Sequence, residues 1–280
     1  MVKPMKSLNS LIIAASMLFS AQAVAQTAAC DALAGDAKAT AQSVMRSAYP
    51  YDCCDDTIEK CLQAAKPCKL ASRLADETCR LAKSGKTTEE IKHALDQRAL
   101  VMASILPPAK ISLSPEHVWG NPNAKVVLSV YLCGRCPYCS KHVPKLIHAL
   151  ENSSFKDKIA VNLRLFPIKS HENSSQAAIA VEAAAKLGLA WPYLLKSYEN
   201  FDDFSLERMN EWAASIGADP QKFDALMRDA AVRASVVDAK KEGLTNGVES
   251  TPTFFLNGHK IQSTFDVESL VSMLEEALEK

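Results

Sequence analysis

Residues 125–139 of this chain read KVVLSVYLCGRCPYC. The first part of this stretch, 125–132, is rich in β-branched and other apolar side chains, which predicts a buried strand. Pro137 suits the first turn of a helix, because the amide hydrogen that it lacks is not needed there. The sequence therefore places a Cys-x-x-Cys motif, Cys136 to Cys139, at the junction between a strand and the helix that follows it.

That position has a chemical consequence for the two cysteines. At a helix N-terminus, unpaired amides and the helix dipole stabilise a thiolate, so we expect Cys136 to be an exposed sulfur with a lowered pKa. Cys139 lies one turn further into the helix, where we expect it to be shielded yet able to resolve a mixed disulfide on Cys136. The motif predicts thiol–disulfide exchange, with Pro137 and Tyr138 as neighbours of the reacting sulfurs.

A second motif, Thr251-Pro252, lies far downstream and directly precedes an expected strand at 253–256. Proline at the start of a strand cannot donate to the ladder, and a cis peptide bond is a specified feature of such turns. Together with the cysteine pair, the motif favours a cis bond in a loop that faces the sulfurs. Main-chain groups of that loop would be free to pair with an extended substrate segment.

The segments around these two motifs alternate between strand and helix patterns. A second strand is expected at 159–165, and Asn257-Gly258 between two short strands is a strong hairpin signal. The chain is almost wholly helical in pattern at about 172–242, and an amphipathic helix is expected at 267–278. Strands that flank a helical block predict an α/β domain with a helical insertion.

The N-terminus carries an export pattern. Lys3 and Lys6 precede an apolar stretch over 11–24, which ends in the small-x-small motif AVA. We expect a cleaved signal peptide over 1–25 and a periplasmic or secreted protein that begins at about Gln26, the alternative being an uncleaved membrane anchor.

Charge excludes some classes of partner. The 280 residues include 32 basic and 32 acidic side chains, so the formal net charge is zero. This balance leaves no electrostatic footprint for nucleic acid or for an anionic membrane surface. The length is sufficient for two modest domains.

All nine cysteines follow the export segment, which makes structural disulfides expected. Six of them lie in a region whose helical patterns predict a small bundle: Cys30, Cys53, Cys54, Cys61, Cys68 and Cys79. One arrangement nests two bridges across an antiparallel helix pair and leaves a third: Cys54–Cys79, Cys61–Cys68 and Cys30–Cys53. The sequence leaves the connectivity open, and the alternatives to a structural role are a second redox relay, a docking surface and a zinc site.

Several motifs, in one order along the chain, resemble a known family. They are Gly120 to Ala124, the CPYC motif, Phe166-Pro167 with His171 and Ala177-Ala178 after it, and Gly247-Val248 leading to TPTFF at 251–255. From about Trp119 to Lys280 the chain resembles the DsbA-type branch of the thioredoxin superfamily. The resemblance implies a thioredoxin fold with a helical insertion, a nucleophilic Cys136, a resolving Cys139 and a cis-Pro252 opposite them.

Together with this resemblance, the sequence predicts four consecutive segments. A signal peptide over 1–25 is followed by a small all-α cysteine-rich domain over 26–106 and a proline-rich linker over 107–124, part of which (111–113) could add a strand. A DsbA-like thioredoxin domain is expected over 125–280. Its aromatic-rich stretch at 191–204 is expected in the core. In the fold of this family, the same residues could instead form the base of a substrate groove.

Two residues depart from the family pattern. Many relatives carry an acidic residue where this chain has Cys133, and glycine is frequent where it has Ser250. Cys133 is most simply a small buried hydrophobe. The alternatives are a regulatory redox partner of Cys136 or a metal ligand together with Cys136 and Cys139. No fourth thiolate follows for an iron–sulfur cluster and no haem attachment motif is present, so we expect no cofactor.

The sequence thus predicts an exported enzyme that exchanges disulfides with protein substrates. Its expected partners are exported cysteine-containing proteins and a membrane redox protein that recycles it. The alternatives are a disulfide isomerase or reductase that dimerises through the N-terminal domain, and a periplasmic metal-binding protein. The direction of electron flow and the oligomeric state stay open.

Overall fold

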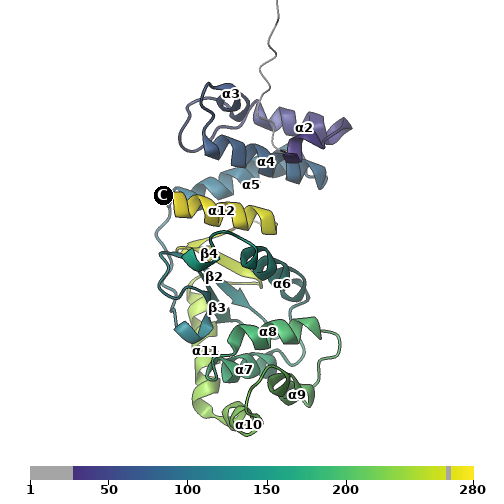
Figure 1. Cartoon of the computed structure of the whole chain (residues 1–280), viewed down its shortest axis with the longest axis vertical. Helices are drawn as coiled ribbons and strands as arrows, with labels where there is room; N and C mark the ends of the chain where they lie inside the picture. The colour runs from purple at the N-terminus through teal and green to yellow at the C-terminus, as the bar shows by residue number, and fades with distance from the viewer. Residues whose placement is uncertain (1–27, 263–265) are drawn as a thin grey trace, which may run out of the picture.

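A five-stranded sheet forms the centre of the region from residue 118 to the end in the computed structural model, which describes residues 28–262 and 266–280 (Figure 1). The strand order is β1-β3-β2-β4-β5. Strands β2 and β3 are parallel, and the other neighbours are antiparallel. The strand bounds are β1 Val118–Gly120, β2 Val126–Leu132, β3 Ile159–Leu165, β4 Thr253–Leu256 and β5 His259–Lys260. The predicted signal peptide lies outside the described residues.

Helix α6 (Pro137–Glu151) connects β2 to β3 and gives the predicted strand–helix–strand unit. A helical block then interrupts the sheet between β3 and β4: α7 Ser174–Ala185, α8 Ala190–Glu199, α9 Arg208–Ser215, α10 Pro220–Arg228 and α11 Ala230–Thr245. The chain ends with α12 (Val267–Glu279). The α/β fold with a helical insertion and a preceding helical region is therefore as predicted from the sequence.

The segment expected to act as a linker contributes to the sheet. Residues 111–113, which we considered as a strand, are not part of it, and β1 at Val118–Gly120 pairs with β3 instead. Side chains rather than a strand partner satisfy the backbone around Ser112: Glu242 accepts from its amide at 2.9 Å, and Asn162 donates to its carbonyl at 3.0 Å. A short 3-10 helix, η1 (Pro115–His117), leads into β1, and a second, η2 (Lys156–Lys158), leads into β3.

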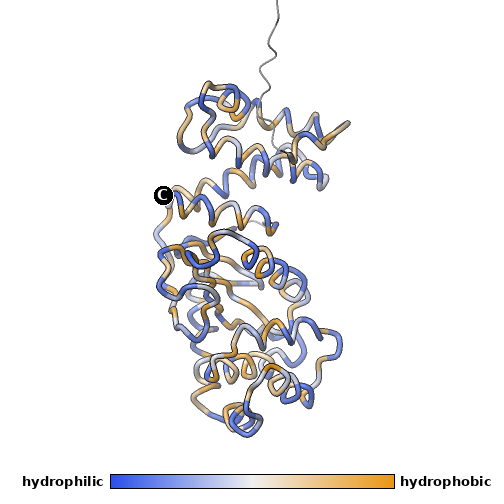
Figure 2. The backbone as a smooth tube through the Cα atoms, in the orientation of Figure 1, coloured by the Kyte–Doolittle hydropathy of each residue, from blue (hydrophilic) through white to orange (hydrophobic). Residues whose placement is uncertain are grey.

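The N-terminal region is a small bundle of helices: α1 Ala28–Asp31, α2 Gly35–Met45, α3 Ile58–Gln63, α4 Lys69–Lys83 and α5 Thr88–Met102. Helix α5 begins with a capping box, in which Thr87 and Glu90 satisfy each other's backbone amides. Apolar and polar residues alternate along these helices, so each has one face for the bundle interior (Figure 2). Within the described residues, none of the helices is both long and apolar enough to cross a membrane.

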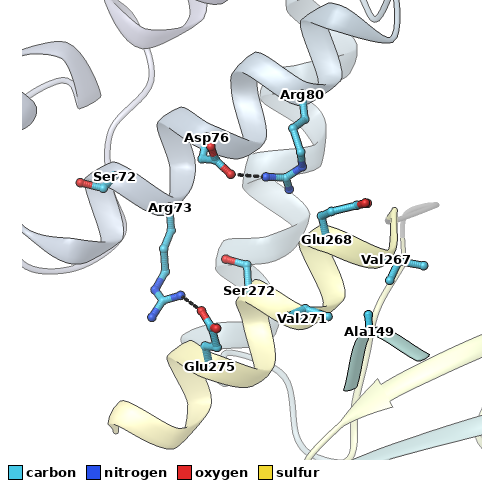
Figure 3. A pocket seen from close by; sticks show the side chains of 10 residues that line it. All are labelled: Ser72, Arg73, Asp76, Arg80, Ala149, Val267, Glu268, Val271, Ser272 and Glu275. Carbon is cyan, nitrogen blue, oxygen red and sulfur yellow. Dashed lines mark hydrogen bonds and ion pairs between the residues drawn. The ribbon is translucent and has the colours of Figure 1, made fainter. Parts of the chain in front are cut away.

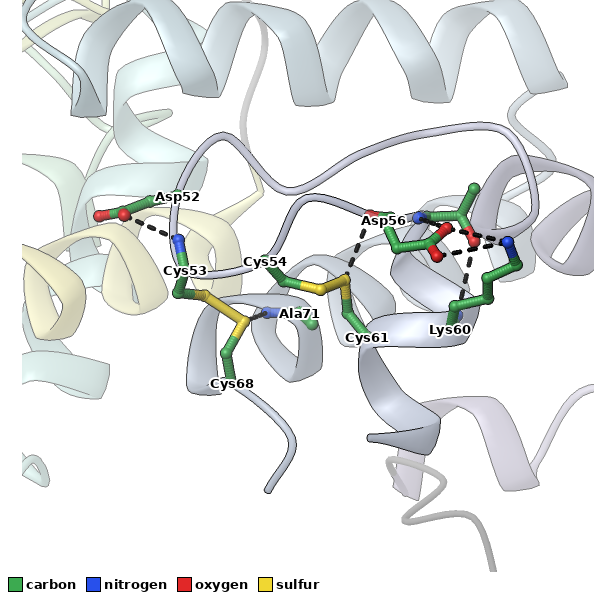
Figure 4. The surroundings of a disulfide bond; sticks show 9 residues. Asp52, Cys53, Cys54, Asp56, Lys60, Cys61, Cys68 and Ala71 are labelled. Carbon is green, nitrogen blue, oxygen red and sulfur yellow. Dashed lines mark hydrogen bonds and ion pairs between the residues drawn. A yellow bond between two sulfur atoms is a disulfide. The ribbon is translucent and has the colours of Figure 1, made fainter. Parts of the chain in front are cut away.

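All six N-terminal cysteines form disulfides, as expected, but the nested pairing is wrong. The bonds are Cys30–Cys79, Cys53–Cys68 and Cys54–Cys61 (Figure 4 shows the last two). The nested arrangement assumed that the bridges Cys54–Cys79 and Cys61–Cys68 both lie across one antiparallel pair of helices. Instead Cys53 and Cys54 belong to the irregular segment between α2 and α3, which folds back over the N-terminus of α4, while α1 packs against α4 and carries its cysteine there.

A buried charged cluster joins the two regions. Arg98 of α5 is 0% exposed and forms ion pairs with Glu77 of α4 at 2.6 Å and Glu276 of α12 at 2.8 Å. The hydroxyl of Tyr51 lies 2.7 Å from the Glu276 carboxylate and accepts from Arg98 Nε at 3.3 Å. Buried charges persist only when they are paired in this way. We call these four residues the Arg98 cluster.

Outside the Arg98 cluster, a groove of about 470 Å³ runs between α4 and α12 (Figure 3). Arg73 crosses it to Glu275 at 2.7 Å, and Arg80 is held by Asp76 on its own helix at 2.5 Å. Four of the charged groups that line the groove, Arg73, Glu275, Asp76 and Arg80, are thus paired within it, and the groove belongs to the contact between the N-terminal region and α12.

Candidate active site

Cys136 occupies the junction that the sequence predicts. Strand β2 ends at Leu132, and a turn closed by the Cys136 amide donating to the Cys133 carbonyl at 3.0 Å leads into α6. Cys136 is the N-cap residue of α6, and Pro137 is its first helical residue. The sulfur therefore lies at the end of a helix where free amides face it.

The Thr251-Pro252 peptide bond is cis, as predicted, and its loop faces the sulfurs. Cys136 Sγ lies 3.2 Å from the carbonyl oxygen of Thr251. The Thr251 hydroxyl is buried in this loop and lowers the pKa of Cys136. Segments from opposite ends of the domain are thus brought together around one thiol.

The two cysteines differ in acidity, as the motif predicts. A hydrogen bond from the Cys139 thiol is the largest cause that lowers the pKa of Cys136, to about 5. Burial opposes this shift, and hydrogen bonds from Thr251 and from the amides of Cys139 and Tyr138 add to it. Burial raises the pKa of Cys139 well above its usual value, and the neighbouring Cys136 raises it further. Near neutral pH the site holds one thiolate and one thiol.

The expected exposure of Cys136 is wrong. The residue is 1% exposed, whereas Tyr138, two positions later, is 68% exposed. The Thr251-Pro252 loop accounts for the difference, because its carbonyl lies against the sulfur where the sequence argument assumed open solvent. A reacting partner must therefore approach alongside this loop.

Two grooves adjoin the start of α6, and they are lined by the neighbours of the cysteines, Tyr138 in one and Pro137 in the other, rather than by the cysteines themselves. The first, of about 500 Å³, lies between α6, the cis-proline loop and α12, and its lining includes Tyr138, His142, Thr251 and Pro252. The second, of about 530 Å³, lies between the start of α6 and the segment after α8, and its lining includes Pro137 and Phe201. Together they provide space on either side of the α6 N-terminus for an extended chain.

Cys133 is buried and lies 3.4 Å from Nδ1 of His171. Burial raises the pKa of the Cys133 thiol. These observations favour the interpretation of Cys133 as a small buried hydrophobe. Among residues 28–262 and 266–280, no group of three His, Cys, Asp or Glu side chains is arranged to hold a metal ion, so the metal-binding alternative has no cluster to support it.

Two residues beside the site were not identified from the sequence. Tyr198 is buried, and its hydroxyl donates to the Cys133 carbonyl at 3.1 Å. The Arg135 guanidinium lies 4.4 Å from the ring centres of both Phe201 and Phe204 and donates to the Phe201 carbonyl at 2.6 Å. The aromatic-rich stretch 191–204 was the available signal, and its last part does line the second groove.

The sequence of this chain is similar to those of known proteins over its second region. Residues 112–276 match the sequence profile of a protein family described as Thioredoxin. A Na(+)/H(+) antiporter NhaA 1 from Mycobacterium sp. (strain KMS) is 31% identical over 185 residues, which are 61% of this chain and 29% of that protein. An antiporter NhaA from Herminiimonas arsenicoxydans is 29% identical over 57% of this chain and 25% of its own length. The chain thus spans less than a third of these relatives.

Solved structures share the fold at low sequence identity. BdbD from Bacillus subtilis in its oxidised form has a TM-score of 0.53 and 18% identity, and the match covers 62% of this chain and 98% of that one. The catalytic domain of Proteus mirabilis ScsC has a TM-score of 0.51 and 18% identity, over 67% and 98%. The thiol-disulfide exchange protein alpha-DsbA2 from Wolbachia pipientis has a TM-score of 0.52 and 19% identity, over 66% and 97%.

Proposed function

Because the chain belongs to the thioredoxin family, with a DsbA-like domain over residues 112–276, we propose that it exchanges disulfides with protein substrates through a mixed disulfide on Cys136. The observation that carries this proposal is the pairing of a stabilised Cys136 thiolate with a protonated Cys139 one turn away. The thiolate is the nucleophile in such exchange, and the adjacent thiol is the group that resolves the intermediate.

The exchange proceeds in two balanced steps. The Cys136 thiolate attacks one sulfur of a substrate disulfide, the mixed disulfide forms, and the other substrate sulfur leaves as a thiolate. Cys139 then loses its proton and attacks Cys136 Sγ, which forms the Cys136–Cys139 disulfide and releases the second substrate thiolate. Two electrons pass to the substrate. The same steps in reverse transfer a disulfide from the protein to a dithiol.

The cis-proline loop is where the substrate segment would bind. The Thr251 carbonyl lies beside Cys136 Sγ, and the grooves on either side of the α6 N-terminus leave room for an extended segment. A substrate cysteine that lies along this loop would bring its sulfur to Cys136 while its neighbours pair with free main-chain groups. The burial of Cys136 in the free protein then slows its reaction with reagents that lack such a segment, without preventing it.

The acidity of Cys136 favours disulfide donation. A stabilised thiolate stabilises the reduced protein relative to its disulfide, which makes the disulfide more oxidising. A pKa of about 5 lies between about 7 for thioredoxin and about 3.5 for DsbA. We therefore expect a reduction potential between about −270 and about −120 mV, the values of those two proteins.

We further propose that exchange takes place after export, in the periplasm or outside the cell. The basic residues and the apolar stretch at the N-terminus support export. Three disulfides in the N-terminal region suit an oxidising compartment. Substrates would be exported cysteine-containing proteins, and a membrane redox protein would restore the active disulfide. Antiporter activity is not part of the proposal, because the chain spans 29% of the relative with that name.

A Cys139→Ala variant tests the proposal directly. This variant forms the mixed disulfide but cannot resolve it, so exported proteins should be recovered covalently bound to Cys136 after acid quenching. The matched control is the Cys136→Ala, Cys139→Ala double variant, from which no adduct should be recovered. Absence of adducts in the single variant, with Cys136 free and reactive towards iodoacetamide, would refute the exchange of disulfides with proteins.

A further inference from the structure

The two neighbouring disulfides at the start of α4 are chemically unlike. Cys53 is exposed and Cys68 half-buried, whereas Cys61, in the adjacent bond, is buried (Figure 4). Thiol–disulfide exchange requires a thiolate to reach one sulfur along the axis of the bond. Access alone therefore favours attack on Cys53 Sγ over attack on Cys61.

The sulfur that would leave also differs between the two bonds. Cys68 is the N-cap residue of the 15-residue helix α4, and its Sγ accepts the amide hydrogen of Ala71 at 3.4 Å. A thiolate in that position is stabilised by the free amides and the dipole of the helix, as a low-pKa leaving group must be. Two features therefore favour an exchange in which Cys68 is the leaving group: Cys53 Sγ is accessible to attack, and the amides around Cys68 Sγ stabilise its thiolate.

The remaining bonds lack this combination. Cys61 Sγ lies 3.1 Å from the carbonyl oxygen of Asp56, which would repel a thiolate (Figure 4). Both sulfurs of the third bond, Cys30–Cys79, belong to buried residues, so an incoming thiolate reaches neither of them as readily as Cys53. Cys54 is half-buried, but attack on it would have to expel Cys61.

We propose that Cys53–Cys68 is a second thiol-exchange site of this protein, opened by small thiols or by cysteine thiolates of other proteins. An incoming thiolate attacks Cys53 Sγ, a new disulfide forms there, and the electron pair of the broken bond passes to Cys68 Sγ as a thiolate held by the Ala71 amide. A second thiolate that attacks the mixed disulfide releases the Cys53 thiol. The reductant is oxidised to its disulfide, and one protein disulfide is reduced.

The test uses the full protein with Cys136→Ala and Cys139→Ala, so that the active-site pair takes no part and the outcome is independent of the proposed function. The protein is treated with a fixed concentration of 2-mercaptoethanol, an uncharged thiol, and samples taken over time are quenched in acid, alkylated and analysed by tandem mass spectrometry. Cys53–Cys68 should open about tenfold faster than the other two bonds. The mercaptoethanol adduct should lie on Cys53.

The proposal is overturned if Cys53–Cys68 opens together with or after the other bonds, or if the adduct lies on Cys68. An Ala71→Pro variant examines the cause, because proline removes the amide that faces Cys68. It should abolish the tenfold difference, whereas Lys69→Pro, with a proline in the same turn, should keep it. If Ala71→Pro does not fold, the order of opening in the parent protein decides by itself.

Discussion

The carbonyl oxygen of Thr251 lies 3.2 Å from Sγ of Cys136, although the two residues are 115 positions apart in the chain. A carbonyl cannot donate to a thiolate, so this contact suits the protonated thiol of Cys136, while the Thr251 hydroxyl and the α6 amides suit the thiolate. The loop therefore supplies an acceptor for the thiol and a hydroxyl that favours the thiolate.

The acidity of Cys136 can be measured by its alkylation. The rate of reaction with iodoacetamide should rise as pH increases through about 5 and be nearly constant above about pH 7, because the thiolate is the reactive form. Cys139, whose pKa is raised by burial, should stay unmodified over this range. A Cys136→Ala variant identifies any background reaction of Cys133. A midpoint near the ordinary cysteine value of about 8.5 would contradict the predicted thiolate.

The same lowered pKa makes the stability of the reduced protein depend on pH. Because the pKa of Cys136 is lower in the folded than in the unfolded protein, its contribution is present above about pH 8.5 and is lost as the pH falls through about 5. The oxidised protein has no such thiol. The melting temperature of the reduced form should therefore fall relative to that of the oxidised form between about pH 8 and about pH 4, and an unchanged difference would contradict the prediction.

The effect of the Thr251 hydroxyl on Cys136 can be tested with one substitution that removes the hydroxyl and one that keeps it. Thr251→Val removes the hydroxyl that lowers the pKa of Cys136 and should shift the alkylation midpoint upwards, whereas Thr251→Ser keeps the hydroxyl and should leave the midpoint close to that of the parent protein. The shift is expected to be a fraction of the total, since the Cys139 thiol is the larger cause. An equal midpoint for Val and Ser would show that the hydroxyl does not act on Cys136.

The Arg98 cluster predicts a large loss of stability on truncation. Arg98→Met leaves the Glu77 and Glu276 carboxylates buried without their partner, which should lower the free energy of unfolding by about 3–5 kcal/mol. The control is Lys69→Met, which breaks an exposed ion pair with Glu279 and should cost less than about 1 kcal/mol. Urea denaturation measures both. Similar losses in the two variants would indicate that the cluster is not buried in solution.

The three disulfides should differ in their effect on stability. Cys30–Cys79 closes a separation of 49 residues and Cys54–Cys61 one of 7. On the chain-entropy estimate, replacing the first pair with serine should cost about 4 kcal/mol and the second about 2 kcal/mol. Thermal denaturation of both double variants checks the order, and a greater loss for the shorter loop would contradict it.

The features predicted correctly from the sequence are those fixed within a short segment. Residues 125–139 contain a strand pattern, the Cys-x-x-Cys motif and a proline suited to the first turn of a helix. Because these signals are adjacent in sequence, β2, Cys136 and α6 could be placed without a structure. The cis bond at Pro252 was favoured by its chemistry next to the cysteine pair. The helical insertion between β3 and β4 follows from the alternation of hydrophobic patterns.

The features that were wrong or missed depend on the path of the chain in space. The disulfide pairing depends on where the irregular segment before α3 lies relative to α4, and loops carry no periodic signal. Cys136 was expected to be exposed because the loop that covers it lies far away in sequence. The role of Arg98 was missed, since an arginine within a helical pattern gives no indication that it is fully buried among acidic partners.

Helix α12 has a consequence for how the molecule melts. One side of it packs against α6 and β2, while Glu276 on the same helix completes the Arg98 cluster with α4 and α5 (Figure 1). The last helix thus contributes apolar side chains to the interior of the sheet domain and charged side chains to the contact with the N-terminal helices, so the two regions cannot separate without breaking the Arg98 cluster. We expect calorimetry to record a single endotherm for the whole molecule rather than separate transitions for its two halves.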